Sequence, residues 1–213
     1  ETMPPAELMR AILLAPVELL WFGGIGTYVK AATQSQAEVG DRANDAIRVN
    51  GRDLKARVIG EGANLGMTQP GRVEYALAGG RLNTDSIDNS AGVDCSDHEV
   101  NIKILTGLLE QKKKLPRPQR DKLLARMTGE VGALVLRDNY LQTQAISATE
   151  RLAAHLLDRH ARFMRGLEKA GKLDRALEYL PNDEMLAERL AMQRGLTRPE
   201  LAILLSYAKI VLY

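Results

Sequence analysis

The distribution of glycine and proline constrains the fold of this chain more than any other feature of its sequence. Thirteen of the 18 glycines lie before residue 110, where short apolar runs alternate with polar segments that contain glycine. Residues 111–118, Gln-Lys-Lys-Lys-Leu-Pro-Arg-Pro, then combine a charge run with two prolines, which stop a helix. Beyond them, apolar residues recur at helical spacing. We therefore expect an extended connector here and two domains, residues 1–115 and residues 116–213.

The first half has the pattern of a parallel sheet with helices. Apolar runs at residues 17–22 and 56–59 each end at glycine and predict strands, and a third strand is expected at residues 83–87. Helices are expected between Pro4 and Pro16 and over residues 33–48 and 91–109. This alternation predicts the α/β class, with a partial Rossmann-like parallel sheet that is followed by an all-α helical domain. Since three strands do not complete a doubly wound sheet, we expect the chain to be a piece of a longer polypeptide.

The second half predicts five helices. Apolar residues mark one over residues 123–135, a second that begins near residue 145, and a short third over residues 173–180. Asn182 or Asp183 is expected to cap a fourth helix, which runs through Arg194 to a left-handed stop at Gly195. Residues 197–200, Thr-Arg-Pro-Glu, form a capping box for a fifth helix that is apolar nearly all round and therefore expected to be buried.

Composition narrows the class of protein. The net charge is +2, and no apolar run approaches the roughly 20 residues that cross a bilayer. A single cysteine, Cys95, forms no internal disulfide and indicates a reducing compartment. Basic residues outnumber acidic ones after residue 110 but alternate with them, which favours a solvated helical face over a nucleic-acid site. We expect a cytoplasmic protein without a membrane or nucleic-acid partner.

Two polar turns follow the first two predicted strands. Residues 23–27, Gly-Gly-Ile-Gly-Thr, include Gly24 and Gly26, which allow a backbone to approach a nucleotide, but the spacing misses the full G-x-G-x-x-G and a plain tight turn is favoured. Residues 61–64, Glu-Gly-Ala-Asn, end at Asn64. An asparagine at the carboxyl end of a parallel strand suits a ribose or carboxamide ligand and suits a turn equally well.

A third polar segment, residues 87–99, begins the helix expected at residues 91–109. Asp88, Asn89 or Ser90 is placed to cap this helix, whose free amides attract a polar or anionic ligand group. Cys95 and His98 lie near three acidic residues, but the spacing matches no zinc pattern, so we expect no metal site.

Together these motifs resemble glutamate dehydrogenases, specifically the large NAD-specific bacterial enzymes. The matching stretches are Leu-Leu-Trp-Phe-Gly-Gly-Ile-Gly-Thr-Tyr-Val-Lys at 19–30, Gly-Asp-Arg-Ala-Asn-Asp-Ala-Ile-Arg at 40–48, Gly-Glu-Gly-Ala-Asn-Leu-Gly-Met-Thr-Gln at 60–69, and Ile-Asp-Asn-Ser-Ala-Gly-Val-Asp-Cys-Ser-Asp-His-Glu-Val-Asn-Ile-Lys at 87–103. The helical half is similar to the tail of the same enzymes, including residues 137–146 and 198–202.

The resemblance implies oxidative deamination of L-glutamate to 2-oxoglutarate and ammonia, with hydride transfer to NAD. It implies that Asn64 and Asn89 lie by the cofactor, that Gly24 and Gly26 line the cleft near the nicotinamide, and that Ser96 holds the distal carboxylate of the substrate. The sequence Asn-Ser-Ala-Gly at 89–92 departs from the family's Asn-Ala-Gly-Gly, so that Ala91 stands where the family has a glycine that allows close backbone approach.

The resemblance also implies what the chain lacks. The catalytic Lys and Asp and the diphosphate loop of the family would precede residue 1, so we expect no catalytic residue here and an inactive isolated fragment. The full-length protein is expected to be a homo-oligomer. The alternative is a non-catalytic helical interaction module with an α/β partner domain.

Overall fold

The computed structural model describes residues 2–212, whose contacts divide the chain into two compact units. The chain up to Asp88 and the chain from Ala145 onward form unit 1, and Asn89–Gln144 form unit 2. The predicted domain boundary at about residue 115 does not coincide with these units, because it falls inside unit 2. As a division between family domains it stays a prediction.

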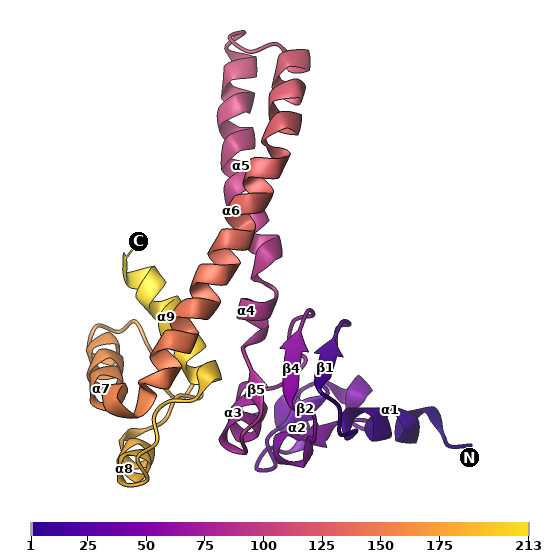
Figure 1. The fold of residues 1–213 in the computed structure, drawn as a ribbon, viewed down its shortest axis with the longest axis vertical. Coiled ribbons are helices and arrows are strands. Elements are labelled where there is room, and N and C mark those ends of the chain that lie inside the picture. Colours follow the sequence, from indigo (N-terminus) through magenta and orange to yellow (C-terminus); the bar gives the residue numbers. More distant parts are fainter. Residues whose placement is uncertain (1, 213) are drawn as a thin grey trace. The chain divides into compact units, whose positions relative to one another are not determined.

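Unit 1 contains a parallel sheet near its N-terminus (Figure 1). Within residues 2–212 its strands are β1 (Leu19–Phe22), β4 (Val58–Glu61) and β5 (Arg81–Leu82), in the order β1-β4-β5. Both pairings are parallel, and Phe22 of β1 lies opposite Glu61 of β4. The predicted fold class is confirmed, because a small parallel sheet in the first half is followed by helices.

Short elements surround this sheet. They are α1 (Pro5–Leu13), α2 (Gln36–Val39), α3 (Gln69–Leu77), α4 (Asp85–Asp88), the 3₁₀ turns η1 (Arg42–Asn44) and η2 (Gly51–Asp53), and a two-stranded parallel sheet of β2 (Val29–Lys30) and β3 (Val49–Asn50). The core of this region combines residues from both sheets and α3, including Phe22, Val29, Ile59, Met67 and Tyr75.

Two predictions for this region are wrong. The helix expected over residues 33–48 is only the four-residue α2, because a capping box between Ser35 and Glu38 starts it and Gly40, at φ 75°, ends it. The strand expected over residues 83–87 is wrong as well, because β5 ends at Leu82 and α4 follows. The backbone carbonyl of Thr84 accepts hydrogen bonds from the amides of Ile87 and Asp88, and this turn of helix begins there.

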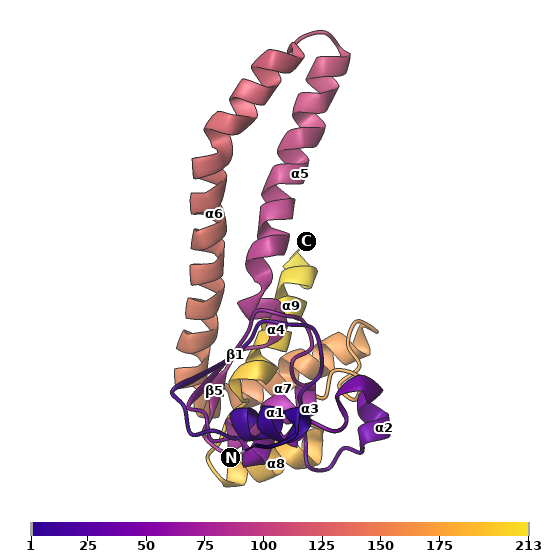
Figure 2. The same ribbon diagram turned by 90° about the vertical axis from the view of Figure 1, so that its right-hand side faces the viewer.

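Unit 2 is a helical hairpin. Its helices are α5 (Ser90–Gln111), as predicted, and most of α6 (Arg117–Arg151), which run side by side in opposite directions (Figure 2). Polar side chains set their register, since Asn139 accepts from Ser90 Oγ at 2.5 Å and donates to Asp94 at 2.8 Å. His98 Nε2 lies 2.9 Å from Asp138 Oδ2.

The connector between α5 and α6 is a closed turn, so the prediction of an extended connector is wrong. Lys113 adopts a left-handed φ of 56°, and the amides of Lys114 and Leu115 return to the carbonyl of Leu109 at 2.9 and 3.3 Å. Pro118 falls in the first turn of α6, where a missing amide costs no helical hydrogen bond. The two prolines therefore start a helix instead of preventing one.

The remaining helices belong to unit 1. They are the end of α6 from Ala145, α7 (Ala153–Lys169), α8 (Asp183–Ala191) and α9 (Arg198–Leu212). The second expected helix is α7, but it begins at Ala153 and not near residue 145, because α6 continues to Arg151. No helix forms over residues 173–180 either, although Leu173 and Leu180 are buried and anchor this loop in the core.

Helix α8 begins as predicted and ends earlier than predicted. Asn182 caps it by accepting the amide of Met185 at 2.9 Å. The left-handed residue after it is Gln193, at φ 54°, and not Gly195. Gly195 has a different role, since a Cβ there would lie 2.2 Å from the carbonyl carbon of Ala153.

Helix α9 carries the predicted cap and is buried only in part. The carboxylate of Glu200 accepts from the amide and the hydroxyl of Thr197, both at 2.7 Å. Leu201 and Leu204 lie in the helical core of unit 1, whereas Leu212 is 87% exposed. Within residues 2–212, no helix combines the length and the apolar character needed to span a bilayer.

Candidate functional site

The carboxyl ends of β1 and β4 bring two of the predicted turns together. The amide of Ala63 donates to the carbonyl of Phe22 at 3.0 Å, and the amide of Tyr28 donates to the carbonyl of Gly66 at 2.9 Å. The loop with Gly24 and Gly26 therefore lies beside the turn with Asn64. Ligands of open parallel sheets bind at this edge.

Gly26 is required by the geometry of its loop. Its φ is 145°, and a Cβ there would lie 2.7 Å from Tyr28 Oη and 2.8 Å from Asn44 Nδ2. Tyr28 closes the loop by donating to the carbonyl of Ile25 at 2.9 Å, while its ring stacks on Phe22 with centroids 5.6 Å apart. Gly24 differs, because no atom lies within 4 Å of the position of its Cβ. Gly26 shapes the turn, and Gly24 leaves its backbone open to approach.

Asp41 and Arg48 hold the same loop through hydrogen bonds to the backbone of Thr27. Asp41 accepts the amide of Thr27 at 2.8 Å and the side chain of Asn44 at 2.7 Å, which lowers the pKa of Asp41 below its ordinary 3.8. Arg48 is 2% exposed and donates to the carbonyl of Thr27 at 2.8 Å. An ionised Asp41 at neutral pH therefore fixes the loop to the segment at 40–48.

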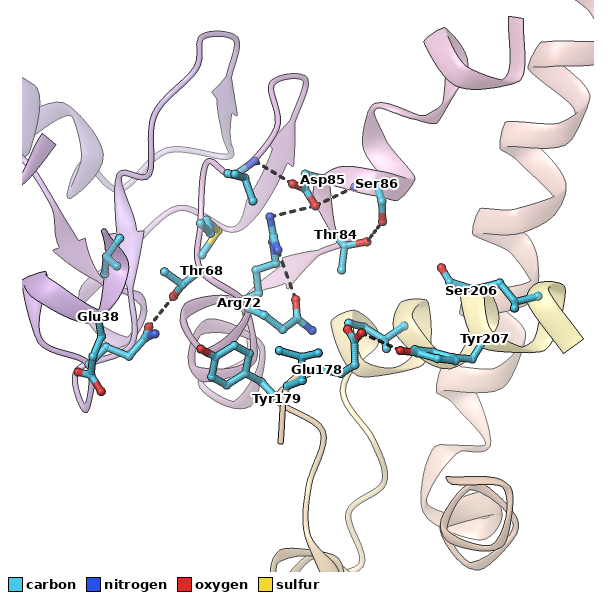
Figure 3. Close-up of a pocket in the computed structure, with 18 residues that line it drawn as sticks. Glu38, Thr68, Arg72, Thr84, Asp85, Ser86, Glu178, Tyr179, Ser206 and Tyr207 are labelled. Carbon is cyan, nitrogen blue, oxygen red and sulfur yellow. Dashed lines mark hydrogen bonds and ion pairs between the residues drawn. The ribbon is translucent and has the colours of Figure 1, made fainter. Parts of the chain in front are cut away.

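An ionic triad with two buried members, Glu61 and Arg72, and the half-buried Asp85 shapes the turn that follows β4. Glu61, which is 1% exposed, accepts from Arg72 Nε at 2.7 Å and from the other arm of Arg72 at 2.9 Å. Arg72 also pairs with Asp85 at 3.2 Å, as Figure 3 shows. Asp85 in turn accepts the amide of Leu65 at 2.8 Å, and Glu61 accepts that of Met67 at 3.0 Å. Burial raises the pKa of Glu61, and the hydrogen bonds from Arg72 oppose that rise.

Trp21 lies against the backbone that leads into this turn. A Cβ at Gly60 would lie 2.5 Å from its ring, and a Cβ at Gly62 2.4 Å. The ring is nevertheless 56% exposed. Glycine at both positions is therefore needed for the packing of Trp21 and not for backbone freedom.

A hollow of about 560 Å³ adjoins the turn (Figure 3). Leu65 and Asp85 line it from the α/β part, and Glu178 and Tyr207, joined by a hydrogen bond of 2.7 Å, line it from the helical part. This bond raises the pKa of Tyr207 to about 12. The volume suits a small molecule, but the carboxylates of Glu38, Asp85 and Glu178 on its walls disfavour a phosphate.

Asn89 and Ser96 lie in unit 2. Asn89 occupies the N-cap position of α5, with no capping hydrogen bond from its side chain. Ser96 is exposed, and its hydroxyl donates to the carbonyl of Gly92 at 3.2 Å. The structure thus brings Gly24, Gly26 and Asn64 together, and describes Asn89 and Ser96 only within their own helical unit.

Acidic residues, histidines and Cys95 gather into no cluster of three or more that could bind a metal within residues 2–212. Cys95 is exposed, and His98 is paired with Asp138.

Four charged residues that support the edge were not predicted from the sequence, namely Asp41, Arg48, Arg72 and Asp85. Asp41 and Arg48 fall in the segment at 40–48 that carries part of the resemblance, and this resemblance was the one sequence signal that pointed to them. Nothing in the sequence indicated that Arg72 would be buried against Glu61.

A parallel sheet whose carboxyl edge carries adjoining polar turns is typical of the α/β class, whose members bind ligands at this edge. The family described as bacterial NAD-glutamate dehydrogenase, catalytic domain, matches residues 1–149. The chain belongs to this family.

Curated relatives agree with this assignment. The NAD-specific glutamate dehydrogenases of Pseudomonas aeruginosa, Halomonas elongata and Mycobacterium tuberculosis are 58%, 55% and 52% identical to the chain over 210, 212 and 208 residues. These alignments include 99%, 100% and 98% of the chain. The chain spans only 13% of the length of each relative.

Proposed function

We propose that the chain completes the cofactor cleft of an NAD-specific glutamate dehydrogenase as part of a longer polypeptide. The observation that carries this proposal is the pair of hydrogen-bonded turns at the carboxyl ends of β1 and β4, which presents Gly24 and the exposed Asn64 at one edge. The family match and the names of the relatives support NAD as the cofactor and glutamate as the substrate.

The residues present fit such a cofactor. The side chain of Asn64 offers both a donor and an acceptor, as a carboxamide or a ribose requires, and the open space above Gly24 allows close backbone approach. The triad of Glu61, Arg72 and Asp85 keeps the turn rigid, so that little ordering is needed on binding.

When bound, NAD would supply the hydride acceptor for the oxidation of L-glutamate at its α-carbon, and the overall reaction with water would give 2-oxoglutarate, ammonia and NADH. In this reaction the chain orients its reactants. Asn64 and Asn89 hydrogen-bond the cofactor, Gly24 and Gly26 line its cleft, and Ser96 donates to the distal carboxylate of the substrate. The proton-transferring groups belong to the rest of the enzyme.

The test is steady-state kinetics of NADH formation by the full-length enzyme. Ser96→Ala removes a hydrogen bond to a carboxylate, worth about 1.5–3 kcal/mol, so the KM for glutamate should rise roughly 10- to 100-fold. Thr128→Ala is the matched control, because Thr128 is exposed on α6 and donates in the same way to a carbonyl one turn earlier, that of Leu124. An unchanged KM in Ser96→Ala removes Ser96 from the site.

The same assay tests the cofactor contacts. Asn64→Ala and Asn89→Ala should each raise the KM for NAD, whereas Asn101→Ala, a change at an exposed asparagine on α5, should leave it unaltered. A wild-type enzyme without glutamate-dependent NADH formation would favour the alternative, a helical interaction module.

We further propose that the whole enzyme is a cytoplasmic homo-oligomer without nucleic-acid or membrane partners. The basic side chains support the last point, since Arg162, Arg165 and Arg175 of the helical half are each paired with a carboxylate. The 213-residue chain alone should be catalytically inactive.

A further inference from the structure

We propose that Arg198 is a positioning residue that fixes the cofactor-binding turn of residues 61–64 from the C-terminal half of the chain. The inference rests on the proposed function, because it assumes that this turn contacts NAD. Arg198 is the first residue of α9 and lies 115 positions along the sequence from its nearest polar partner in the α/β part.

A continuous series of hydrogen bonds joins Arg198 to the turn. Arg198 Nε donates to Asn83 Oδ1 at 2.6 Å, and Asn83 Nδ2 donates to Asp88 Oδ1 at 2.6 Å. The second oxygen of Asp88 accepts the amide of Glu61 at 3.0 Å. Asp88 also directly precedes Asn89, the other asparagine assigned to the cofactor.

The chemistry of the groups makes this series directional. A guanidinium has only donors and a carboxylate has only acceptors, so Asn83 must turn its oxygen to Arg198 and its amino group to Asp88. Without Arg198, Asn83 keeps only one of the two partners that fix its orientation, Asp88. The side chain of Asn83 is then held from one side only, and the contact of Asp88 with Glu61 loses that support.

The opposite side of Arg198 is anchored on the end of α6. One terminal nitrogen donates to Ser147 Oγ at 2.9 Å and to Glu150 Oε2 at 3.0 Å. The side chain of Arg198 is 16% exposed, and α9 begins in the core of the helical half. Because donors from the planar fork of one side chain serve both sides, a lysine does not reproduce the arrangement.

The experiment compares Arg198→Gln and Arg198→Lys with wild type in the full-length enzyme. We expect the KM for NAD to rise about 3- to 30-fold in Arg198→Gln, because a charge-assisted hydrogen bond that orders the turn is lost. Arg198→Lys should recover only part of this loss, and the KM for glutamate should change less than the KM for NAD. Arg162→Gln is the control, since Arg162 is exposed on α7 and pairs along its own helix with Asp158.

A double variant tests the route through Asn83. If Arg198 acts through Asn83, then Asn83→Leu alone and Asn83→Leu with Arg198→Gln should have the same KM for NAD. Additive effects of the two changes would overturn this route.

Tryptophan fluorescence supplies a readout that is independent of activity. Trp21 is the only tryptophan of the 213-residue chain, and its ring lies against Gly60 and Gly62 at the turn. In the 213-residue chain, where Trp21 is the only source of this emission, the emission maximum should shift in Arg198→Gln and not in Arg162→Gln. An unchanged spectrum and an unchanged KM for NAD, or equal changes in the control, would overturn the inference. If the wild-type enzyme does not oxidise glutamate, the proposed function fails, while the spectrum still tests the role of Arg198.

Discussion

Replacing Arg72 with methionine should destabilise unit 1 more than any surface change. Methionine keeps an unbranched apolar chain and removes the charge from a side chain that is only 5% exposed. Glu61, which is 1% exposed, would then retain the amide of Met67 at 3.0 Å and lose both hydrogen bonds to Arg72. Removing one partner of a buried pair costs about 3–5 kcal/mol. For a chain of this size the melting temperature should fall by about 6–20 °C.

The pH dependence of the destabilisation distinguishes the loss of the Arg72 charge from a loss of packing. Burial already raises the pKa of Glu61, and without Arg72 nothing of comparable strength opposes the rise. A carboxyl group whose folded pKa lies above its unfolded value contributes stability below the unfolded pKa and loses it as pH rises through the folded pKa. The destabilisation in Arg72→Met should therefore be larger at pH 8 than at pH 5.

The assay is urea unfolding of the 213-residue chain, followed by circular dichroism at both pH values. The matched double variant, Glu61→Gln with Arg72→Met, removes both charges and should recover most of the loss. A loss below about 1 kcal/mol in Arg72→Met would contradict the role of the pair, because surface pairs already reach that value. A double variant as unstable as the single one would show that packing, and not charge, is responsible.

Three further predictions concern the 213-residue chain. The isolated chain should form no NADH and should bind NAD weakly or not at all in calorimetric titration, so micromolar affinity would contradict the expectation that half of the cleft lies elsewhere. Asn182→Ala removes the cap of α8 and should lower the free energy of unfolding by about 0.5–2 kcal/mol in urea titration, and an unchanged midpoint would remove that role. Burial lowers the pKa of His160 below its ordinary 6.5, so the unfolded chain takes up this proton first and stability should fall as pH falls below 6.5. His160→Gln should lose that part of the pH dependence in unfolding curves between pH 5 and 8, and an unaltered profile would show that His160 does not cause it.

Local signals predicted the elements that local chemistry determines. The apolar runs ending in glycine became β1 and β4, and the caps at Asn182 and Thr197 start α8 and α9. The side-chain oxygen or the carboxylate three residues later meets backbone amides within one turn, so a few residues decide the outcome.

Predictions failed where contacts distant in sequence, or a single backbone angle, determine the local structure. Residues 111–118 have the composition of a linker, but Lys113 adopts a left-handed angle and the chain reverses into a hairpin. Gly195 has the sequence of a helix stop, but its lack of a side chain serves close packing on Ala153.

The candidate site was predictable to a similar degree. Turn chemistry and resemblance pointed to Gly24, Gly26 and Asn64, and the structure brings them to one edge. Their supports were not predictable, because Arg72 and Arg198 act through burial and through partners that lie 11 and 115 positions away. Arg198 and Asn83 are 115 positions apart, so no pattern of neighbouring residues contains both.

The most direct test of the account is a structure of the full-length enzyme with NAD bound. We predict that the nicotinamide half of NAD lies at the carboxyl ends of β1 and β4, over Gly24, with the side chains of Asn64 and Asn89 within hydrogen-bond distance of the cofactor. NAD bound at another part of the enzyme, with this edge covered by protein, would contradict the account.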